Sequence, residues 1–276
     1  MPTYRRHIGV ALDLDRTFML QQCGKFDPTA SLDDKAFSKT YLAGGAPVRV
    51  TIARVDDGCE VEVASDADLE GEPCERWVIE LARPLQTFEA HSELSKLARQ
   101  VSGLRLVRVP WLFDVAASMV LQQRVTFADA ARAWRKIAER WGVRSELGLA
   151  FPDAQRMTQI TLSELQALDI DARRARALMA VAREDVFARF LRDATPREKL
   201  RKRLASIHGI GPWTTEMILG WGTGDPDAVP TGDLHLPSFV TEALAGEIIG
   251  TDERMLELLE PFRPHRFLAI RLLWAR

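Results

Sequence analysis

The sequence predicts an α+β protein in which a strand-containing N-terminal part precedes an all-helical part. Apolar and polar residues alternate with period two at residues 48–55 and 59–63, on either side of an Asp-Gly turn. This pattern is a strong signal for a β-hairpin. From residue 110 onward, apolar residues recur every three or four positions, which is the period of an amphipathic helix. The length of 276 residues allows two domains, and we place them at 1–105 and 106–276.

The first hundred residues are expected to be mixed α/β beyond that hairpin. Residues 77–81 are apolar and β-prone, and the sequence leaves open whether they form another strand or a short helix. No internal repeat or low-complexity segment occurs, so the sequence does not indicate a repeat architecture.

The helical part opens with an apolar helix at residues 114–123. Thr126, followed by Asp129, resembles a capping box and starts a second helix, which ends at Gly142. Within it, Trp134 and Trp141 recur at helical spacing, which is most simply a core position.

Capping residues also mark the later helices. Thr161 and Glu164 form a capping box, and Thr195 followed by Pro196 starts a basic helix. Thr251 starts a helix over residues 253–259, and Pro264 starts the last one, which runs to Trp274.

Composition indicates a globular protein without a membrane segment. Hydrophobic residues make up 46% and charged residues 28%, and no apolar run is long enough to span a bilayer. The N-terminal segment lacks the pattern of a signal peptide, and the three cysteines, Cys23, Cys59 and Cys74, are scattered and odd in number. These features predict a cytoplasmic location and no disulfide framework.

The charge is unevenly distributed along the chain. The net charge is −2, yet residues 171–211 carry 11 basic and 5 acidic side chains. A basic run is usually a solvated helix face. Because this one leads directly into a glycine-containing turn, we interpret it as a surface that faces DNA.

That turn, with an acid beyond it, is the most informative motif in the sequence. Gly209 and Gly211 flank Ile210, where glycine allows a positive φ and a close backbone approach. The free N–H groups at the start of the following helix suit a DNA phosphate. Asp233 follows in a Gly/Pro/Asp-rich loop. A Gly-x-Gly pair alone would indicate only a structural turn, but the basic segment, Trp213 and Asp233 favour a DNA-binding hairpin.

This combination resembles the helix-hairpin-helix DNA glycosylase superfamily, and within it the 3-methyladenine DNA glycosylase II family of alkylation repair. The similar segments are 103–114, 117–126, 208–217, 229–235 and 264–274, so the resemblance covers about 103–276. The family has a TBP-like α/β domain where residues 1–102 lie, a match by position and hairpin content only. The sequence departs from the family at His208, where proline is more usual, and at His265, where tryptophan is common.

The resemblance implies a helical domain of two lobes with the active-site cleft between them, and it implies roles for individual residues. Asp233 would be the catalytic acid that stabilises an oxocarbenium-like sugar, and Trp213, Met217 and Trp274 would line the substrate pocket. The residues implied in DNA binding are Gln123, Arg124, His208, Gly209, Ile210, Gly211 and Thr214.

Each of these roles has a plainer alternative. Asp233 could cap the next helix, the two tryptophans could be core residues, and Arg124 could be an ordinary surface residue rather than the wedge that fills the gap left by a flipped base. The family archetype has an apolar wedge, and it has an aromatic residue where this chain has Met217.

Two absences refine the expected activity. Endonuclease III-like relatives carry a Schiff-base lysine directly after the hairpin, where this chain has Trp213, so no AP-lyase activity is expected. Relatives with an iron–sulfur cluster use four cysteines near the C-terminus, whereas all three cysteines here lie in the first 74 residues. His208, His235 and His265 match no zinc pattern, so we expect neither a metal nor a cofactor.

The predicted function is therefore that of a monofunctional glycosylase that flips alkylated purines out of double-stranded DNA and hydrolyses their N-glycosidic bonds. We expect a monomer that is cytoplasmic, nucleoid-associated and without a membrane partner. Two alternatives stay open: a non-catalytic helix-hairpin-helix DNA-binding module, and a glycosylase for oxidised or deaminated bases.

Overall fold

A five-stranded antiparallel sheet occupies the N-terminal part of the chain. The computed structural model describes residues 3–65, 88, 92–109, 111–184, 187 and 197–275. The strands are β1 (Thr3–Ile8), β2 (Ala30–Leu32), β3 (Ala36–Ala43), β4 (Ala46–Val55) and β5 (Gly58–Ser65), in the spatial order β1-β5-β4-β3-β2. A short helix, α1 (Leu14–Phe18), lies between β1 and β2. The predicted residues 77–81 lie outside the described part of the chain.

The hairpin predicted from the Asp-Gly turn is confirmed as β4 and β5, with Val55 opposite Gly58. Gly58 has φ +150°, and a Cβ atom there would lie 2.1 Å from the carbonyl oxygen of Ile8, so no other residue fits this turn. Val50 and Ile52 alternate inward along β4 with exposed or half-buried neighbours, as a sheet with one covered face requires.

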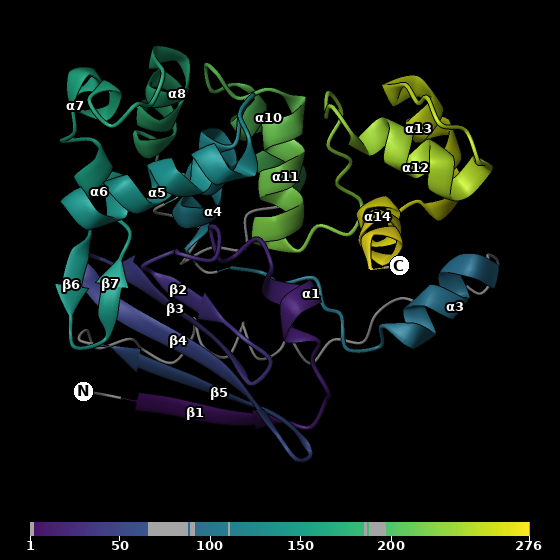
Figure 1. The fold of residues 1–276 in the computed structure, drawn as a ribbon, viewed down its shortest axis with the longest axis horizontal. Coiled ribbons are helices and arrows are strands. Elements are labelled where there is room, and N and C mark those ends of the chain that lie inside the picture. The colour runs from purple at the N-terminus through teal and green to yellow at the C-terminus, as the bar shows by residue number, and fades with distance from the viewer. Residues whose placement is uncertain are drawn as a thin grey trace.

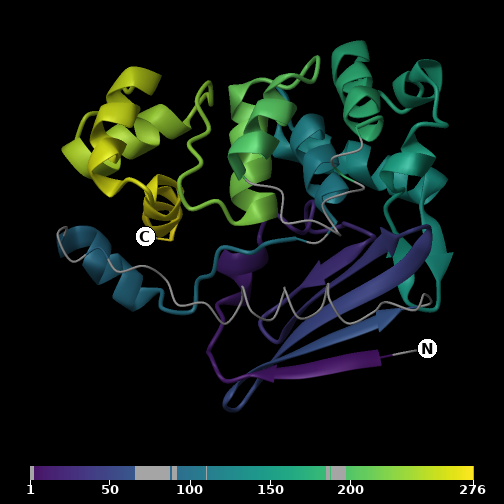
Figure 2. The same cartoon turned by 180° about the vertical axis from the view of Figure 1, so that it is seen from behind.

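The helices lie over one face of this sheet and beyond its edge (Figures 1 and 2). The first group is α4 (Leu112–Leu121), α5 (Phe127–Trp141), α6 (Ala154–Met157), α7 (Leu162–Gln166), α8 (Ala172–Ala182), α10 (Arg197–Ala205) and α11 (Pro212–Thr223). A small hairpin of β6 (Val143–Ser145) and β7 (Gly148–Ala150) follows α5. The second group is α12 (Leu236–Ala245), α13 (Asp252–Leu259), the short 3₁₀ helix η1 (Glu260–Phe262) and α14 (Arg266–Trp274), with α3 (Ser92–Gln100) below it. The α+β class is therefore confirmed.

The predicted helix caps are present where the structure describes them. The hydroxyl of Thr126 accepts a hydrogen bond from the N–H of Asp129, and Thr161 and Glu164 form a complete capping box. The hydroxyl of Thr251 caps α13 by accepting a hydrogen bond from the N–H of Arg254. The predicted cap at residues 195 and 196 lies outside the described residues.

The buried side chains form two cores. The larger one joins the sheet to the helices α4–α11, with Trp134 fully buried and stacked on Phe151 at 3.7 Å between ring centroids. The smaller one joins α3 to α12, α13 and α14. The larger core contains residues from both sides of position 105, so the division at 105/106 stays a prediction. Among the described residues, no helix has the length and apolar character needed to cross a membrane.

Candidate DNA-binding and catalytic site

The loop between α10 and α11 forms the predicted hairpin. Its two glycines differ in backbone conformation and in the space around them. Gly209 has φ +88°, and a Cβ atom there would lie 2.9 Å from the Cβ of Ala177 in α8. Gly211 has φ −92° and precedes the first turn of α11. A Cβ on Gly211 would meet nothing within 4 Å. The expected positive φ and close approach therefore hold for Gly209, while Gly211 leaves open space beside the free N–H groups of α11.

Gln123 ties the hairpin to the end of α4. Its side-chain amide donates to the carbonyl oxygen of Gly209 at 3.0 Å and to the hydroxyl of Thr214 at 2.9 Å. Thr214 and Ile210 are both buried. Gln123, Thr214 and Ile210, which are predicted to bind DNA, therefore make their contacts inside the protein. They would contribute to DNA binding by holding the hairpin in shape rather than by touching DNA.

Arg124, His208 and Gly211 are the exposed members of the predicted DNA-binding set. Arg124 has φ +55°, one of two positive-φ positions occupied by a residue other than glycine in the described chain. Such a conformation costs free energy for a side chain with a Cβ atom. The turn between α4 and α5 therefore holds an exposed arginine in a strained conformation beside the hairpin, which is compatible with the wedge predicted there.

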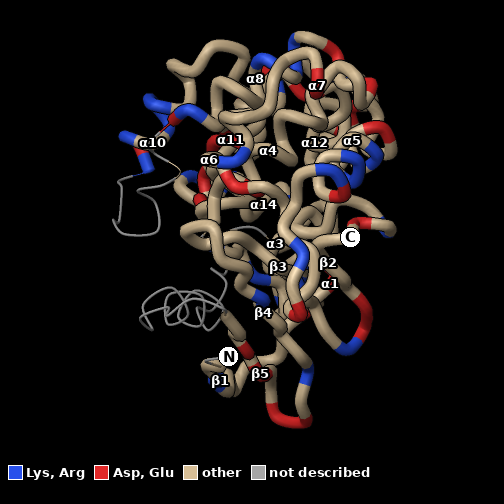
Figure 3. Tube along the Cα trace, turned by 90° about the vertical axis from the view of Figure 1, so that its left-hand side faces the viewer, with Lys and Arg blue, Asp and Glu red and all other residues tan. Residues whose placement is uncertain are grey.

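The predicted basic surface is smaller than its sequence suggests. Arg174 is buried and donates to the carbonyl oxygen of Leu121, while Arg201 is held by carboxylates. Arg173, Arg176, Lys199 and Lys202 are exposed, and Figure 3 shows the basic residues of α10 at the surface. The exposed cations of α8 and α10 lie on the two helices that pack around the hairpin.

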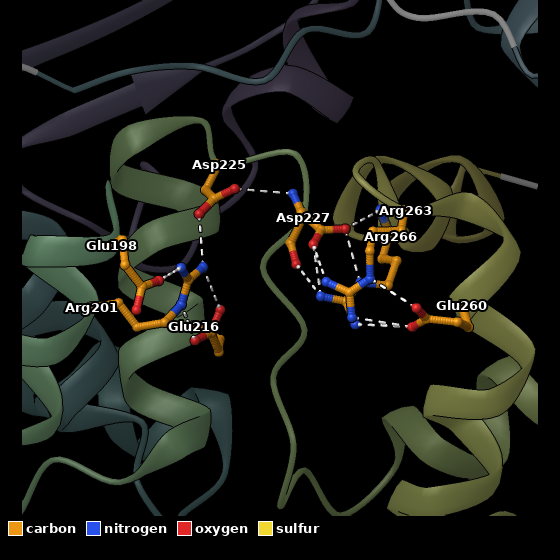
Figure 4. Close-up of polar contacts among 8 residues, drawn as sticks. All are labelled: Glu198, Arg201, Glu216, Asp225, Asp227, Glu260, Arg263 and Arg266. Atoms are coloured by element: carbon orange, nitrogen blue, oxygen red, sulfur yellow. Dashed lines mark hydrogen bonds and ion pairs between the residues drawn. The ribbon is translucent and has the colours of Figure 1, made fainter. Parts of the chain in front are cut away.

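Two ion-pair clusters fix the loop that leads from α11 to Asp233 (Figure 4). In the first, Arg201 of α10 binds Glu216 of α11 at 2.7 Å and Asp225 at 2.8 Å. In the second, Asp227 binds Arg266 of α14 at 2.7 Å and Arg263 at 3.2 Å. The first cluster joins α10, α11 and the start of the loop. The second joins the loop to α14, which belongs to the smaller core. Neither cluster is predicted by the sequence.

Asp233 accepts hydrogen bonds on both carboxylate oxygens. Its Oδ2 accepts from the indole N–H of Trp213 at 2.7 Å. Its Oδ1 accepts from the backbone N–H groups of His235 and Leu236 at 2.8 and 2.9 Å. These bonds to the backbone at the start of α12 are those expected of the helix-capping alternative, and the N-cap residue of α12 is His235. The structure also places the carboxylate at the hairpin, because Trp213 lies in the first turn of α11.

An aromatic cluster extends from Trp213 into the molecule. Trp213 and Met217 lie one turn apart on α11, and Trp221, which the sequence analysis missed, continues the same face. Trp274 of α14 lies nearly parallel to Trp221 with 6.5 Å between ring centroids, and Phe239 of α12 lies 6.4 Å from Trp274. Trp274 is 37% exposed, so it is not a core residue. Trp213 and Met217 therefore lie on α11, and Trp274 reaches that helix through its contact with Trp221.

No group of three His, Cys, Asp or Glu side chains that could hold a metal ion occurs within the described ranges. Cys23 and Cys59 are free and buried, and burial raises the pKa of the Cys59 thiol to about 11. Cys74 lies outside the described residues.

Most of the helical region matches a known family of repair proteins. Residues 117–264 match the family described as HhH-GPD superfamily base excision DNA repair protein. This chain belongs to that superfamily. The matched residues extend from within α4 to the segment just before α14 and include the hairpin and Asp233.

Individual relatives are more distant. A DNA-3-methyladenine glycosylase of Bacillus subtilis is 25% identical over 184 residues, which are 64% of this chain and 61% of that protein. The matched region thus spans less than two thirds of that relative. Among solved structures, the 3-methyladenine DNA glycosylase of Archaeoglobus fulgidus has a TM-score of 0.80 at 19% identity, with 98% of this chain and 97% of that chain covered.

An 8-oxoguanine glycosylase/lyase of Clostridium acetobutylicum has a TM-score of 0.70 at 14% identity, with 100% and 98% covered. The two structures share their fold with this chain. At these identities the fold alone does not separate alkylation repair from 8-oxoguanine repair.

Proposed function

We propose that this protein is a monofunctional DNA glycosylase that turns an alkylated purine, such as 3-methyladenine, out of double-stranded DNA and hydrolyses its N-glycosidic bond. The observation that carries the proposal is the fixed carboxylate of Asp233, hydrogen-bonded to Trp213 directly beside the hairpin. The name of the B. subtilis relative, a DNA-3-methyladenine glycosylase, supports the substrate class.

We infer that different groups of the site contribute to different steps of base excision. The N–H groups at the start of α11, next to the open space at Gly211, would bind a backbone phosphate. Arg124 would fill the gap that the flipped nucleotide leaves, and Trp213 and Met217 would contact the base. Because glycosidic cleavage builds positive charge on the sugar, the carboxylate of Asp233 would stabilise that charge and orient the attacking water.

The absence of lyase activity is part of the proposal. Strand cleavage through a Schiff base needs an amine near the sugar. The position directly after the hairpin is Trp213, whose indole N–H is bound to Asp233 and cannot act as a nucleophile. We further propose that the protein acts as a monomer in the cytoplasm, associated with the nucleoid.

The test is base release by Asp233→Asn. Asparagine retains an oxygen that can accept from the N–H groups of α12, so the fold and DNA binding should persist while excision of 3-methyladenine is lost. Treating reaction products with and without alkali shows whether strands break only at the abasic site afterwards. Undiminished base release by D233N would refute the catalytic role. A wild-type protein that binds DNA but releases no base from a panel of lesions would favour the binding-module alternative.

A further inference from the structure

The loop of residues 23–29, between α1 and β2, is fixed by one buried carboxylate. Asp27 is 6% exposed, and its Oδ2 accepts a hydrogen bond from the backbone N–H of Cys23 at 2.7 Å. Its Oδ1 accepts from the backbone N–H of Thr29 at 2.8 Å, from the Thr29 hydroxyl at 2.7 Å and from the indole N–H of Trp134 at 2.9 Å. The bonds from Cys23 and Thr29 close the loop on itself, and the bond from Trp134 ties it to α5.

The same loop packs directly against the start of α5. Gly24 has φ +85°, and a Cβ atom there would lie 2.8 Å from the Cβ of Ala131 and 3.9 Å from a ring carbon of Phe127. Any larger residue at Gly24 would push the loop away from the helix. The loop therefore holds a defined position against the first turns of α5.

Between these attachments the loop presents an aromatic ring to solvent. Phe26 is 74% exposed, and Lys25 beside it is exposed as well. Phe127, at the start of α5, is 43% exposed. Single exposed apolar residues are ordinary on protein surfaces, but aromatic rings together with a cation form the combination that binds unpaired bases. We call Lys25, Phe26 and Phe127 the Phe26 surface.

The Phe26 surface adjoins the turn between α4 and α5 that carries the proposed wedge. Arg124 lies three residues before Phe127. On one side of Arg124, the amide of Gln123 donates to the carbonyl oxygen of Gly209 in the hairpin. On the other side, Phe127 lies next to the 23–29 loop. The wedge turn thus joins the hairpin to the Phe26 surface. If the hairpin holds the strand with the lesion, the Phe26 surface is left to face the opposite strand.

The charges around the Phe26 surface are compatible with nucleic acid. Lys25 supplies a positive charge that can pair with a phosphate. The acids of the two segments are engaged within the protein, because Asp27 is buried among its donors and Asp129 binds Arg132 at 2.8 Å. Neither carboxylate therefore opposes the approach of a DNA strand as a free exposed charge.

We propose that the Phe26 surface stacks on the base opposite the lesion once the damaged nucleotide has been turned out. The proposal rests on the glycosylase function above and adds a contact with the undamaged strand to that site. When one base of a pair leaves the helix, the opposite base loses its hydrogen-bond partner. An aromatic ring stabilises such a base by stacking, which is tolerant of sequence because every base has a π-face. The expected ligand is therefore an unpaired base of any identity.

The test measures the binding of two duplex oligonucleotides by fluorescence anisotropy. Both carry a tetrahydrofuran abasic analogue at the lesion position, so that no base can be excised, and the opposite position holds either thymine or a second abasic analogue. The proteins are the wild type, Phe26→Ala, Phe26→Trp and Val55→Ala. V55A is the matched control, because Val55 is also exposed, at 41%, but lies at the end of β4 in the sheet.

We expect F26A to weaken binding about tenfold when thymine is present and less than twofold when the opposite base is missing. F26W should bind as the wild type does, and V55A should change neither duplex. Equal weakening of both duplexes by F26A would indicate a contact with the backbone alone and overturn the proposal. Unchanged binding of both would overturn it as well. Failure of the glycosylase function itself would appear separately, as full base release by D233N, which the binding comparison does not measure.

Discussion

Replacing Gly209 by alanine should destabilise the hairpin by an amount that the structure allows us to work out. The backbone there has φ +88°, which costs a residue with a Cβ atom about 1–2 kcal/mol. The added methyl group would also lie 2.9 Å from the Cβ of Ala177, and overpacking of this kind costs about 1–3 kcal/mol. We therefore expect G209A to lower the free energy of unfolding by about 2–5 kcal/mol.

Gly211→Ala is the matched control two residues away. At φ −92° alanine is unstrained, and its methyl group would meet no neighbour within 4 Å. Alanine restricts the unfolded chain more than glycine does, which stabilises the folded protein by about 0.4–1 kcal/mol. Because Gly211 is the N-cap residue of α11 and alanine is a poorer N-cap, part of this gain is lost. G211A should therefore keep its stability within about 1 kcal/mol of the wild type. If a phosphate approaches the N–H groups of α11, the same methyl group should lower DNA affinity about tenfold.

Urea unfolding and fluorescence anisotropy with a duplex oligonucleotide separate the two effects. The double variant Ala177→Gly/G209A removes the contact but keeps the positive φ, so a double-mutant cycle should return a favourable coupling of about 1–3 kcal/mol between these sites. A G209A protein as stable as the wild type, or a coupling near zero, would refute the steric argument. Unchanged DNA affinity in G211A would refute the phosphate site at this hairpin.

Two further predictions concern Arg124 and Asp114. Arg124→Gly should raise the free energy of unfolding by about 1 kcal/mol, because glycine accepts φ +55° without strain. It should also slow base release, because the side chain that fills the gap in the DNA is gone. Equal or faster excision would argue against Arg124 as the wedge. Burial raises the pKa of Asp114 to about 7, and Lys39, 3.7 Å away, only partly offsets it. Because the folded state then binds this proton more tightly than the unfolded state, stability falls as pH rises from about 4 through 7. Relative to Asp114→Asn, the wild type should lose about 2 kcal/mol between pH 5.5 and 8 in urea unfolding, and parallel pH profiles would contradict the assignment.

The features that could be predicted from sequence are those set by neighbouring residues. The β4–β5 hairpin follows from an Asp-Gly turn between alternating segments, and the caps at Thr126 and Thr161 follow from side chains that bond three residues ahead. The turn and cap signals are complete within a few residues, whereas Asp233 lies 22 residues beyond Gly211 and was identified through the resemblance to the family.

The features that could not be predicted depend on contacts between distant segments. The hydrogen bond from the Gln123 amide to a carbonyl 86 residues away carries no sequence signal, while its predicted DNA-binding role stays a prediction. The position of Phe26 beside α5 carries no sequence signal either, since it is visible only once the 23–29 loop is packed against that helix. Trp221 could have been found, because it lies four residues beyond Met217 on the same helical face.

The long-range ion pairs explain how Asp233, the proposed catalytic group, can be placed precisely on a loop. A carboxylate that stabilises a transition state has to be held to within a fraction of an ångström, which loops rarely achieve alone. Here the loop begins at Asp225, bound to α10 through Arg201, and passes Asp227, bound to α14 through Arg266. It ends at Asp233, bound to α11 and α12. Each attachment joins the loop to a different helix, so the position of the carboxylate reflects the packing of both cores. A change in either core should therefore move Asp233 relative to the hairpin and slow excision before it unfolds the protein.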